Sequence, residues 1–402
     1  MDFRKELDKR TEYAEKVVDK YIPRDTGLAS HVADAMEYSV TAGGKRLRPI
    51  MMQEAYRMYG GCDTDTIEPF MAAIEFIHNY SLVHDDLPAM DNDLYRRGKK
   101  TTHAVYGAGI ATLAGDGLLN LAFETAMKAF SPDPDPVKRE ISGGSSCSEK
   151  EISGEPSCSE KEKEVLGKTG AGSGSCNETD TVPETGLSDL AKYRRVALAL
   201  QILGNRAGIM GMVGGQSADM DADGLSTKAG FSDEMKLEEK GMTMTEAVTR
   251  SGESPDVEQE ELDEKKDLNQ IHSGISDEDR ILFIYHNKTS ALLEASMMVG
   301  AALAGASGEE IRKIQEVARN LGVAFQIQDD ILDVEGDEDI LGKPIGSDAE
   351  NEKFNVVSVF GLARAKEESQ AYSERTLELL KGLSAESPFL SELVLYLLNR
   401  KK

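Results

Sequence analysis

Apolar residues recur at three- and four-residue spacing along most of the chain, which is the period of an amphipathic α-helix. The pattern predicts helices over residues 3–22, 67–83, 109–130, 191–212, 290–305 and 309–332. β-Branched alternation and Asn-Gly hairpin turns do not recur, so few strands are expected. We therefore predict an all-α fold in one domain, residues 1–402, with about ten helices and long insertions at two helix connections.

The two insertions are the segments in which the helical period is lost. Residues 132–185 are rich in Ser, Gly, Glu and Lys and contain a tandem repeat, EISGGSSCSEK followed by EISGEPSCSEK. Residues 221–279 hold 18 acidic and 6 basic residues. Neither segment has an apolar face to bury, so both are predicted to be solvated, disordered low-complexity chain.

The net charge of −26 at pH 7 comes mainly from these insertions. The second carries −12 and the first, with 12 acidic and 6 basic residues, carries −6, so together they supply −18. Such acidity argues against nucleic acid as a partner, because phosphate contacts need clustered Lys and Arg. It leaves open a small polyphosphate that is bound through divalent cations.

Cysteine content and apolar stretches indicate the cellular compartment of the protein. Four cysteines are too few for a disulfide scaffold, and the three in the first insertion are either spectator thiols or a metal-binding tail. The N-terminus is charged and has no apolar signal core. The apolar stretch 290–307 is interrupted by Glu294, which indicates a buried helix and not a membrane span. We expect a cytoplasmic protein with no membrane partner.

Two aspartate clusters follow strongly apolar helical segments, and they are SLVHDDLPAMDND and FQIQDDILD. Asp329 and Asp333 are one helical turn apart on one face, where two carboxylates repel unless a cation lies between them. Pro88 is expected to end the first helix, so that Asp91 can return towards Asp85. Such hard oxygen ligands suit Mg²⁺ together with phosphate oxygens. The alternative for a single cluster is a solvated helix end.

Basic residues alternate with these clusters along the chain. The segment GGKRLRP, residues 43–49, combines glycines that allow close backbone approach with cations that bind phosphate oxygens. Arg96 and Arg97 follow the first cluster, and Lys343 and Lys353 follow the second. This alternation predicts a site for two diphosphate groups, one bound through Mg²⁺ and one bound directly by cations.

In order, the motifs GGKRLRP, HDDLPAMDNDLYRRG, GGQSADMD, HNKT, FQIQDDILD and LGK resemble those of the trans-isoprenyl diphosphate synthases. The first aspartate motif, DDLPAMD, is most similar to that of the bacterial farnesyl diphosphate synthases, and plastid-type geranylgeranyl enzymes share its length. The resemblance implies an isoprenoid synthase-type helical bundle around a central cavity. One departure is Lys353-Phe354-Asn355-Val356-Val357, where the family often has Lys-x-Thr-Tyr.

The resemblance also implies roles for individual residues. Three Mg²⁺ ions would be held by Asp85, Asp91 and Asp329, with Asp86 and Asp333 acting through water or outer contacts. The allylic diphosphate would be held by Arg96, Lys288, Lys343 and Lys353, beside Thr289 and Gln326. Isopentenyl diphosphate would be held by Lys45, Arg48, His78 and Arg97, although His78 alone would suggest an ordinary core histidine. Asp85, Asp86, Arg96, Lys288 and Asp329 are the residues expected to be catalytic.

The implied reaction is a Mg²⁺-dependent condensation of isopentenyl diphosphate with dimethylallyl and geranyl diphosphate through an allylic cation. The resemblance also implies a homodimer, with residues 109–130 in its interface.

Tyr80 lies five residues before Asp85, or about 7.5 Å back along the helix axis. It is predicted to form the floor of the channel for the prenyl tail and so to limit the product to C15. It could instead be an ordinary buried aromatic. Alternatives are a geranylgeranyl synthase, a non-catalytic subunit and, less compatible with GGKRLRP, a terpene cyclase.

Overall fold

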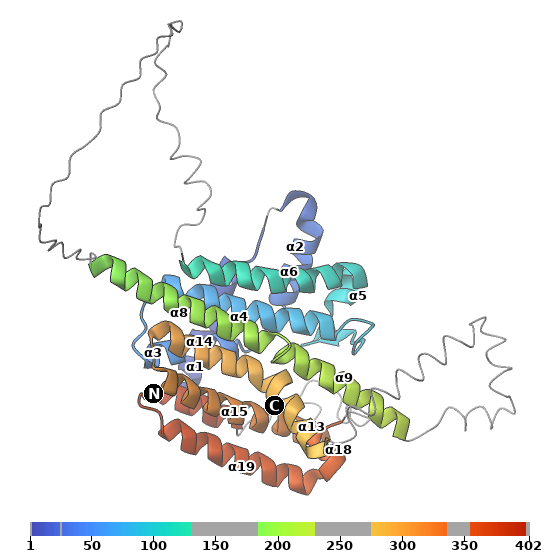
Figure 1. Ribbon diagram of the computed structural model, residues 1–402. Helices are drawn as coiled ribbons and strands as arrows, with labels where there is room; N and C mark the ends of the chain where they lie inside the picture. Colours follow the sequence, from blue (N-terminus) through green and yellow to red (C-terminus); the bar gives the residue numbers. More distant parts are fainter. Residues whose placement is uncertain (1, 25, 131–183, 230–274, 336–353, 399–402) are drawn as a thin grey trace, which may run out of the picture.

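Figure 1 shows a computed structural model of the chain, a bundle of helices that run roughly parallel or antiparallel to one another. The structure describes residues 2–24, 26–130, 184–229, 275–335 and 354–398. Within them the predicted all-α fold is confirmed, with a single two-stranded hairpin as the exception. Most of the two predicted insertions, and both Lys343 and Lys353, lie outside the described residues.

The first part of the chain holds short and long helices up to the first insertion. In order these are α1 (Phe3–Lys20), the 3₁₀ turn η1 (Gly27–Ala29), α2 (Ser30–Val40), α3 (Leu47–Met58), α4 (Thr64–Asp85), the hairpin strands β1 (Tyr95–Arg96) and β2 (Lys99–Lys100), α5 (Thr102–Tyr106), α6 (Ala108–Met127) and η2 (Lys128–Phe130).

The remaining elements complete the bundle. They are α8 (Glu184–Ala207), α9 (Met212–Ala229), α13 (Asp277–Ile284), the π-helical turn η3 (Tyr285–Ser290), α14 (Ala291–Ala304), α15 (Gly308–Glu335), α18 (Val356–Phe360), α19 (Leu362–Lys381) and α20 (Pro388–Leu398). Helix therefore extends through 221–229 and resumes at Asp277, inside the range predicted for the second insertion.

The core is built around α4 and α14, which are apolar on nearly all sides. Every residue of α14 from Ala291 to Leu303 is buried, so the apolar stretch 290–307 forms a core helix, as the sequence indicated. A Cβ at Gly300 would lie 2.2 Å from the carbonyl oxygen of Met52, so the glycine allows α14 to pack directly on α3. Close backbone approach of this kind is a common use of glycine inside a helix.

The predicted helix 191–212 is broken near its end, which is a difference from the sequence pattern. Helix α8 ends at Ala207 and α9 starts at Met212, with Gly208 and Gly211 in the connection. A Cβ at Gly215 would lie 2.1 Å from the backbone nitrogen of Lys288, so only glycine lets α9 lie against η3. The glycines thus bring α9 to the place where it lines the site described below.

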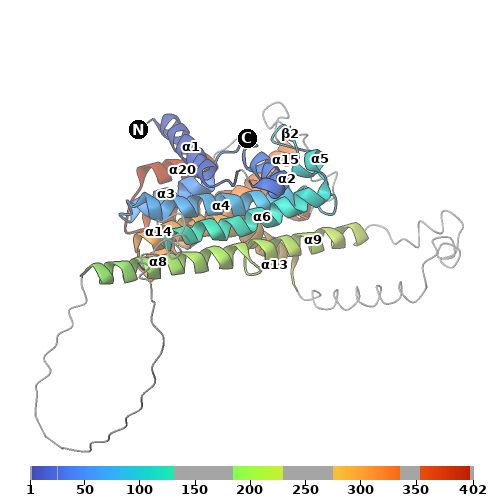
Figure 2. The same cartoon turned by 90° about the horizontal axis from the view of Figure 1, so that it is seen from above.

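One stretch, Asp189–Ala222, has the length and mean hydropathy of a membrane span among the described residues. Only 33% of its most apolar window is buried, and the break between α8 and α9 falls within it. Figure 2 shows α8 and α9 along one side of the bundle, next to α6. Core helices of soluble proteins meet the same criteria of length and composition. The cytoplasmic location stays a prediction.

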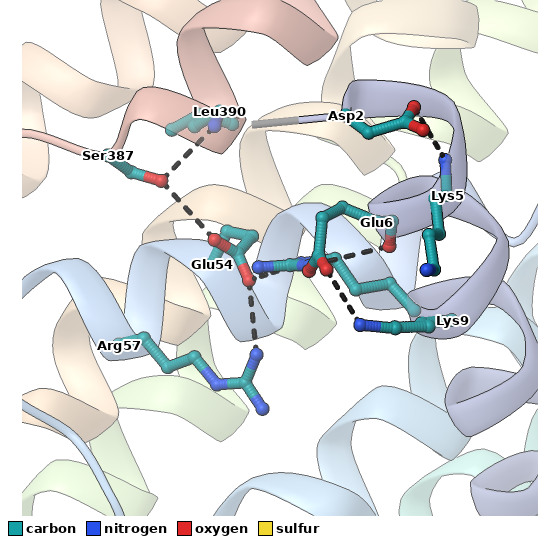
Figure 3. Close-up of polar contacts among 9 residues, drawn as sticks. Asp2, Lys5, Glu6, Lys9, Glu54, Arg57, Ser387 and Leu390 are labelled. Carbon is teal, nitrogen blue, oxygen red and sulfur yellow. Dashed lines mark hydrogen bonds and ion pairs between the residues drawn. The ribbon is translucent and has the colours of Figure 1, made fainter.

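Buried carboxylates connect the ends of the chain to the bundle. Glu54 on α3 accepts a hydrogen bond from Arg10 on α1 at 2.9 Å. It accepts another from Ser387, just before α20, at 3.2 Å, as Figure 3 shows. Glu294 on α14, which is 1% exposed, pairs with Arg206 and Arg319 at 3.2 and 2.9 Å. Because a buried charge is costly unless it is paired, these contacts fix how the helices are placed relative to one another.

Candidate active site

Three adjoining cavities lie along the bundle between α3, α4, α9, η3 and α15. The first has a volume of about 580 Å³ and a largely cationic lining, and it shares Arg48 and His78 with the second. The second, of about 550 Å³, is mainly apolar and shares Lys288 and Thr289 with the third. The third, of about 220 Å³, holds carboxylates from α15. We call them the basic, central and acidic cavities.

The basic cavity contains all four side chains that the resemblance assigned to isopentenyl diphosphate, namely Lys45, Arg48, His78 and Arg97. Local backbone geometry brings them together. Gly43, Gly44 and Arg46 have positive φ angles of 93°, 144° and 48°, which turn the chain sharply before α3. A guanidinium nitrogen of Arg97 donates a hydrogen bond to the carbonyl oxygen of Gly43, so the hairpin is joined to this turn.

One buried cation of the basic cavity, Arg48, is not fully hydrogen-bonded within the protein. Burial, opposed by Glu75 and assisted by Arg97, lowers the pKa of Arg48 to about 10. The buried Nε of Arg48 has no hydrogen-bond partner among the described residues. Burial and the neighbouring arginines, Arg48 first, also hold the pKa of His78 well below its usual value, so the imidazole is neutral at pH 7. An anion in this cavity would be stabilised by the unpartnered guanidinium.

Arg46 behaves differently from Arg48 although only one residue separates them. Its guanidinium donates to Glu75 at 2.7 Å and to the carbonyl oxygen of Val40 at 2.7 Å, and both ionic side chains are almost fully buried. This pair is a structural contact between the turn and α4. The motif GGKRLRP therefore supplies two kinds of arginine, which the sequence alone does not distinguish.

The first aspartate motif begins where α4 ends. Asp85 is the last residue of the helix, and the backbone N–H of Asp91 donates to the carbonyl oxygen of Asp85 at 2.9 Å, so the chain turns back after Pro88 as predicted. Burial, with Asp91 and Asp86 close by and Lys288 and Arg96 opposing, raises the pKa of Asp85 to about 6. A bound cation would stabilise the charged form of a carboxylate in such surroundings.

Asp86 points to the opposite side and holds Arg96. Its Oδ1 accepts a hydrogen bond from Arg96 Nε at 2.7 Å, and the carboxylate is buried. Arg96 also lies 3.6 Å from Asp93. Neither Asp86 nor the Arg96 that it positions lines any of the three cavities, so the supporting role of Asp86 and the diphosphate contact of Arg96 stay predictions.

The second aspartate motif lies on α15 at the acidic cavity. Asp329 and Asp330 line this cavity together with Gln326, whereas Asp333 is 1% exposed and lines none of the three. Thr289 Oγ1 donates to Gln326 Oε1 at 2.7 Å, and Gln326 Nε2 donates to Asp330 Oδ1 at 3.0 Å. The two predicted substrate-channel residues, Thr289 and Gln326, are therefore in contact with the motif.

Lys288 lies between the two aspartate motifs. The π-helical turn η3 directs its ammonium group to Asp219 on α9, with which it forms an ion pair. Burial lowers the pKa of Lys288, but Asp219, Asp85 and Asp91 outweigh it and leave the pKa above its usual value. Lys288 is therefore charged at any pH of interest, within reach of an anion in either the central or the acidic cavity.

Sequence reasoning missed three residues of the site. Asp219 and Gln216 line the acidic and central cavities respectively. Both lie in the motif GGQSADMD, which was a usable signal. Tyr285 also lines the acidic cavity, and burial, followed by the charge of Asp330, raises its pKa well above the usual value. No pattern in the sequence marked Tyr285.

Metal-binding capacity in the described residues is limited to separate carboxylates. No group of three or more His, Cys, Asp or Glu side chains is close enough to hold an ion in this part of the chain. Asp85 and Asp329 instead line adjoining cavities with Lys288 between them. This arrangement fits Mg²⁺ ions that take most of their remaining ligands from water and substrate phosphates.

Comparison with known proteins identifies the family. The model of the polyprenyl synthetases matches residues 29–142 and 190–386. Farnesyl diphosphate synthase of Geobacillus stearothermophilus is 31% identical over 385 residues, which cover 96% of this chain and 93% of the relative. The chain belongs to the polyprenyl synthetase family. It is therefore a prenyltransferase that uses isopentenyl and allylic diphosphates, and the terpene cyclase alternative is set aside.

Other polyprenyl synthetases are similar to nearly the same degree. The chloroplastic large subunit 1 of a heterodimeric geranylgeranyl pyrophosphate synthase of Arabidopsis thaliana is 30% identical over 385 residues, covering 96% of this chain and 76% of the relative. The crystal structure of an FPP/GFPP synthase from Zymomonas mobilis superposes with a TM-score of 0.61 at 22% identity, covering 99% of both chains, and confirms the fold. Because these relatives form products of different lengths at nearly the same identity, the similarity does not fix the product length of this chain.

Proposed function

We propose that this polyprenyl synthetase is a farnesyl diphosphate synthase that makes a C15 product. The observation that carries the product length is the position of Tyr80. It lines the central cavity on α4, about 7.5 Å along the helix from Asp85, and is 6% exposed. Its ring is held edge-on against His84, with 5.8 Å between ring centroids. A rigid aromatic at this depth limits the length of a prenyl tail that starts at Asp85.

The proposed division of the site follows the charges of the cavities. Isopentenyl diphosphate occupies the basic cavity, where Arg48, Arg97 and Lys45 bind its diphosphate directly. The allylic diphosphate lies between Lys288 and the carboxylates of Asp85 and Asp329. These two residues would hold Mg²⁺ together with Asp91, which turns back to Asp85, and Asp333 lies one turn behind Asp329. When bound, Mg²⁺ would supply Lewis-acid stabilisation of the leaving diphosphate.

The chain itself contributes positioning, charge and exclusion of water. Lys288 and Arg96 stabilise the negative charge that develops as the allylic C–O bond breaks. The apolar wall, which includes Met212 and Leu292, surrounds the tail and keeps water from the cation. The isopentenyl double bond, held near the cation by the basic cavity, then forms the new carbon–carbon bond, and a proton leaves to the released diphosphate. No protein nucleophile is required.

Geranylgeranyl diphosphate synthase is the second candidate because Ser81, next to Tyr80, lines the same cavity and is small. The two candidates differ in the product formed by the wild-type enzyme. Incubation with labelled isopentenyl diphosphate and each allylic primer, followed by separation of products by length, should give mainly C15. A wild-type enzyme that makes mainly C20 would overturn the farnesyl assignment and leave the family assignment intact.

Tyr80→Ala should shift the product from C15 to C20 or longer, because removal of the ring opens the central cavity where the tail ends. The first condensation should continue at a comparable rate. Tyr80→Phe is the matched control, since it keeps the ring and removes only the hydroxyl, and it should make C15. Product lengths are compared by chromatography, and an unchanged distribution in Tyr80→Ala would remove Tyr80 from this role.

We also propose that the enzyme is a homodimer whose interface lies on α6 and α8. Figure 2 shows the two helices next to each other along one side of the bundle. Five large apolar side chains on them are exposed, and these are Leu113 and Met127 on α6 and Leu190, Tyr193 and Leu198 on α8. Exposed apolar side chains on neighbouring helices are typical of an interface between subunits.

Leu198→Glu should therefore convert the dimer to a monomer, because it places a charge in the apolar interface. Leu28→Glu is the control, since Leu28 is fully exposed and belongs to η1, outside both helices. Light scattering coupled to size-exclusion chromatography measures the mass. A Leu198→Glu protein with the same mass as the control would contradict an interface on α8.

A further inference from the structure

The hydroxyl of Tyr285 joins the second aspartate motif to the start of α18. It donates a hydrogen bond to Asp330 Oδ2, and it accepts one from the backbone N–H of Val356 at 2.9 Å. Tyr285 is 4% exposed and Asp330 is 3% exposed, so both hydrogen bonds are shielded from water. Hydrogen bonds to a charged acceptor are stronger in such surroundings than at the surface.

The two partners of Tyr285 belong to different segments of the chain that border the acidic cavity. Asp330 belongs to α15, next to Asp329, and Val356 follows Phe354 and Asn355, which line the same cavity. Asn355 caps α18 through a capping box with Ser358, so the first turn of α18 is well formed. The departure from the family pattern at Lys353-Phe354-Asn355-Val356 therefore falls at the point where Tyr285 is bonded.

The chain of hydrogen bonds continues from Asp330 to the lysine-bearing turn. Gln326 donates to the other oxygen of Asp330, and Thr289 donates to Gln326. Tyr285 and Thr289 both belong to η3, so the turn contacts Asp330 directly at one end and through Gln326 at the other. Each carboxylate oxygen of Asp330 therefore accepts a hydrogen bond, one from Tyr285 and one from Gln326, and these fix its orientation.

We propose that Tyr285 is a positioning residue for the acidic cavity, which fixes Asp330 and the Phe354–Asn355 wall relative to η3. Protein groups already occupy a donor and an acceptor position of its hydroxyl, so Tyr285 acts through the groups that it bonds. The inference rests on the proposed function, because it assigns the acidic cavity to an allylic diphosphate with Mg²⁺. It predicts that binding at this cavity depends on the hydroxyl and that binding at the basic cavity does not.

A purely structural role is the competing explanation, since Tyr285 also belongs to an apolar cluster with Ile281, Ile327 and Val356. Tyr372 packs against the same cluster and, with Tyr285, borders the small cleft between α13 and α19. Tyr372→Phe is therefore a matched control that removes a hydroxyl from the same region without touching Asp330. A structural role would lower the melting temperature of the free protein and leave ligand affinity unchanged.

Two variants separate the bonds of Tyr285. Tyr285→Phe removes both hydrogen bonds. Of the two hydrogen bonds, Val356→Pro removes only the one from the N–H of residue 356, and it keeps an apolar side chain in the cluster. This is the first position of α18, where proline is well tolerated after an extended residue such as Asn355 with φ −137° and ψ 174°. The probe is Mg²⁺ with inorganic diphosphate, and the affinity is measured by calorimetric titration and by the rise in melting temperature on binding.

Tyr285→Phe should weaken binding of Mg²⁺–diphosphate about tenfold, the usual effect of losing a hydrogen bond to a charged group. The KM for the allylic diphosphate should rise by a similar factor, and the KM for isopentenyl diphosphate should not change. Val356→Pro should weaken binding about threefold, since only one of the two hydrogen bonds is lost. Tyr372→Phe should match the wild type.

Equal affinities in Tyr285→Phe and Tyr372→Phe would overturn the positioning role, and wild-type affinity in Val356→Pro would overturn the connection to α18. A rise in the KM for isopentenyl diphosphate equal to that for the allylic substrate would indicate general loosening and also overturn the proposal. Failure of the wild type itself to bind Mg²⁺–diphosphate would instead contradict the proposed function.

Discussion

Asp85→Asn and Asp329→Asn should each lower kcat about a thousandfold or more, because each removes a carboxylate that, in the proposed function, would hold Mg²⁺ at the leaving diphosphate. Both residues line cavities next to Lys288, so the lost negative charge lies where the cations must bind. The fold should be unaffected. Burial raises the pKa of Asp85 to about 6, and removal of its charge relieves repulsion with Asp91 and Asp86.

Asp34→Asn, an exposed carboxylate on α2, is the control for this experiment and should have wild-type turnover. Turnover is measured at saturating Mg²⁺ and both substrates, and circular dichroism confirms that each variant is folded. Near-normal kcat in either Asp85→Asn or Asp329→Asn would exclude that residue from the metal site.

Arg48→Met and Arg46→Met should have opposite effects, although the two residues are only two positions apart. Arg48 has a buried Nε without a partner among the described residues, so its removal should leave the free protein as stable as the wild type or more so. The same change should raise the KM for isopentenyl diphosphate about a hundredfold, or about 2.7 kcal/mol, because a direct cation–diphosphate contact is lost.

Arg46→Met removes one member of the buried ion pair with Glu75 and leaves the carboxylate unpaired. Breaking a buried pair in this way costs about 3–5 kcal/mol of unfolding free energy, so the melting temperature should fall clearly. Its effect on the KM for isopentenyl diphosphate should be much smaller than that of Arg48→Met. Thermal unfolding and steady-state kinetics on the two proteins measure both quantities, and a hundredfold rise in KM for Arg46→Met would contradict this division of roles.

Among the described residues, most of the side chains that the resemblance assigned to the site line one of the three cavities. Lys45, Arg48, His78 and Arg97 line one cavity, and Thr289, Gln326 and Asp329 line another. Asp329 lines the acidic cavity, whereas Asp333, one turn further along the helix, is buried and does not. Helical spacing cannot distinguish the two residues, because it places both on one face of the helix. Lys343 and Lys353 lie outside the described residues and stay predictions.

By itself the sequence determined the all-α class, the approximate helices and the family, because helical periodicity and motif order are local properties of the chain. Only the tertiary structure decided which polar groups meet. The spacing of GGKRLRP does not show that Arg46 forms an ion pair with Glu75, 29 residues away, while Arg48 keeps a buried Nε with no hydrogen-bond partner among the described residues. Nor does any local pattern join Tyr285 to Val356 across 71 residues. Such pairings depend on how helices pack, and buried charges and hydroxyls find partners only after that packing is complete.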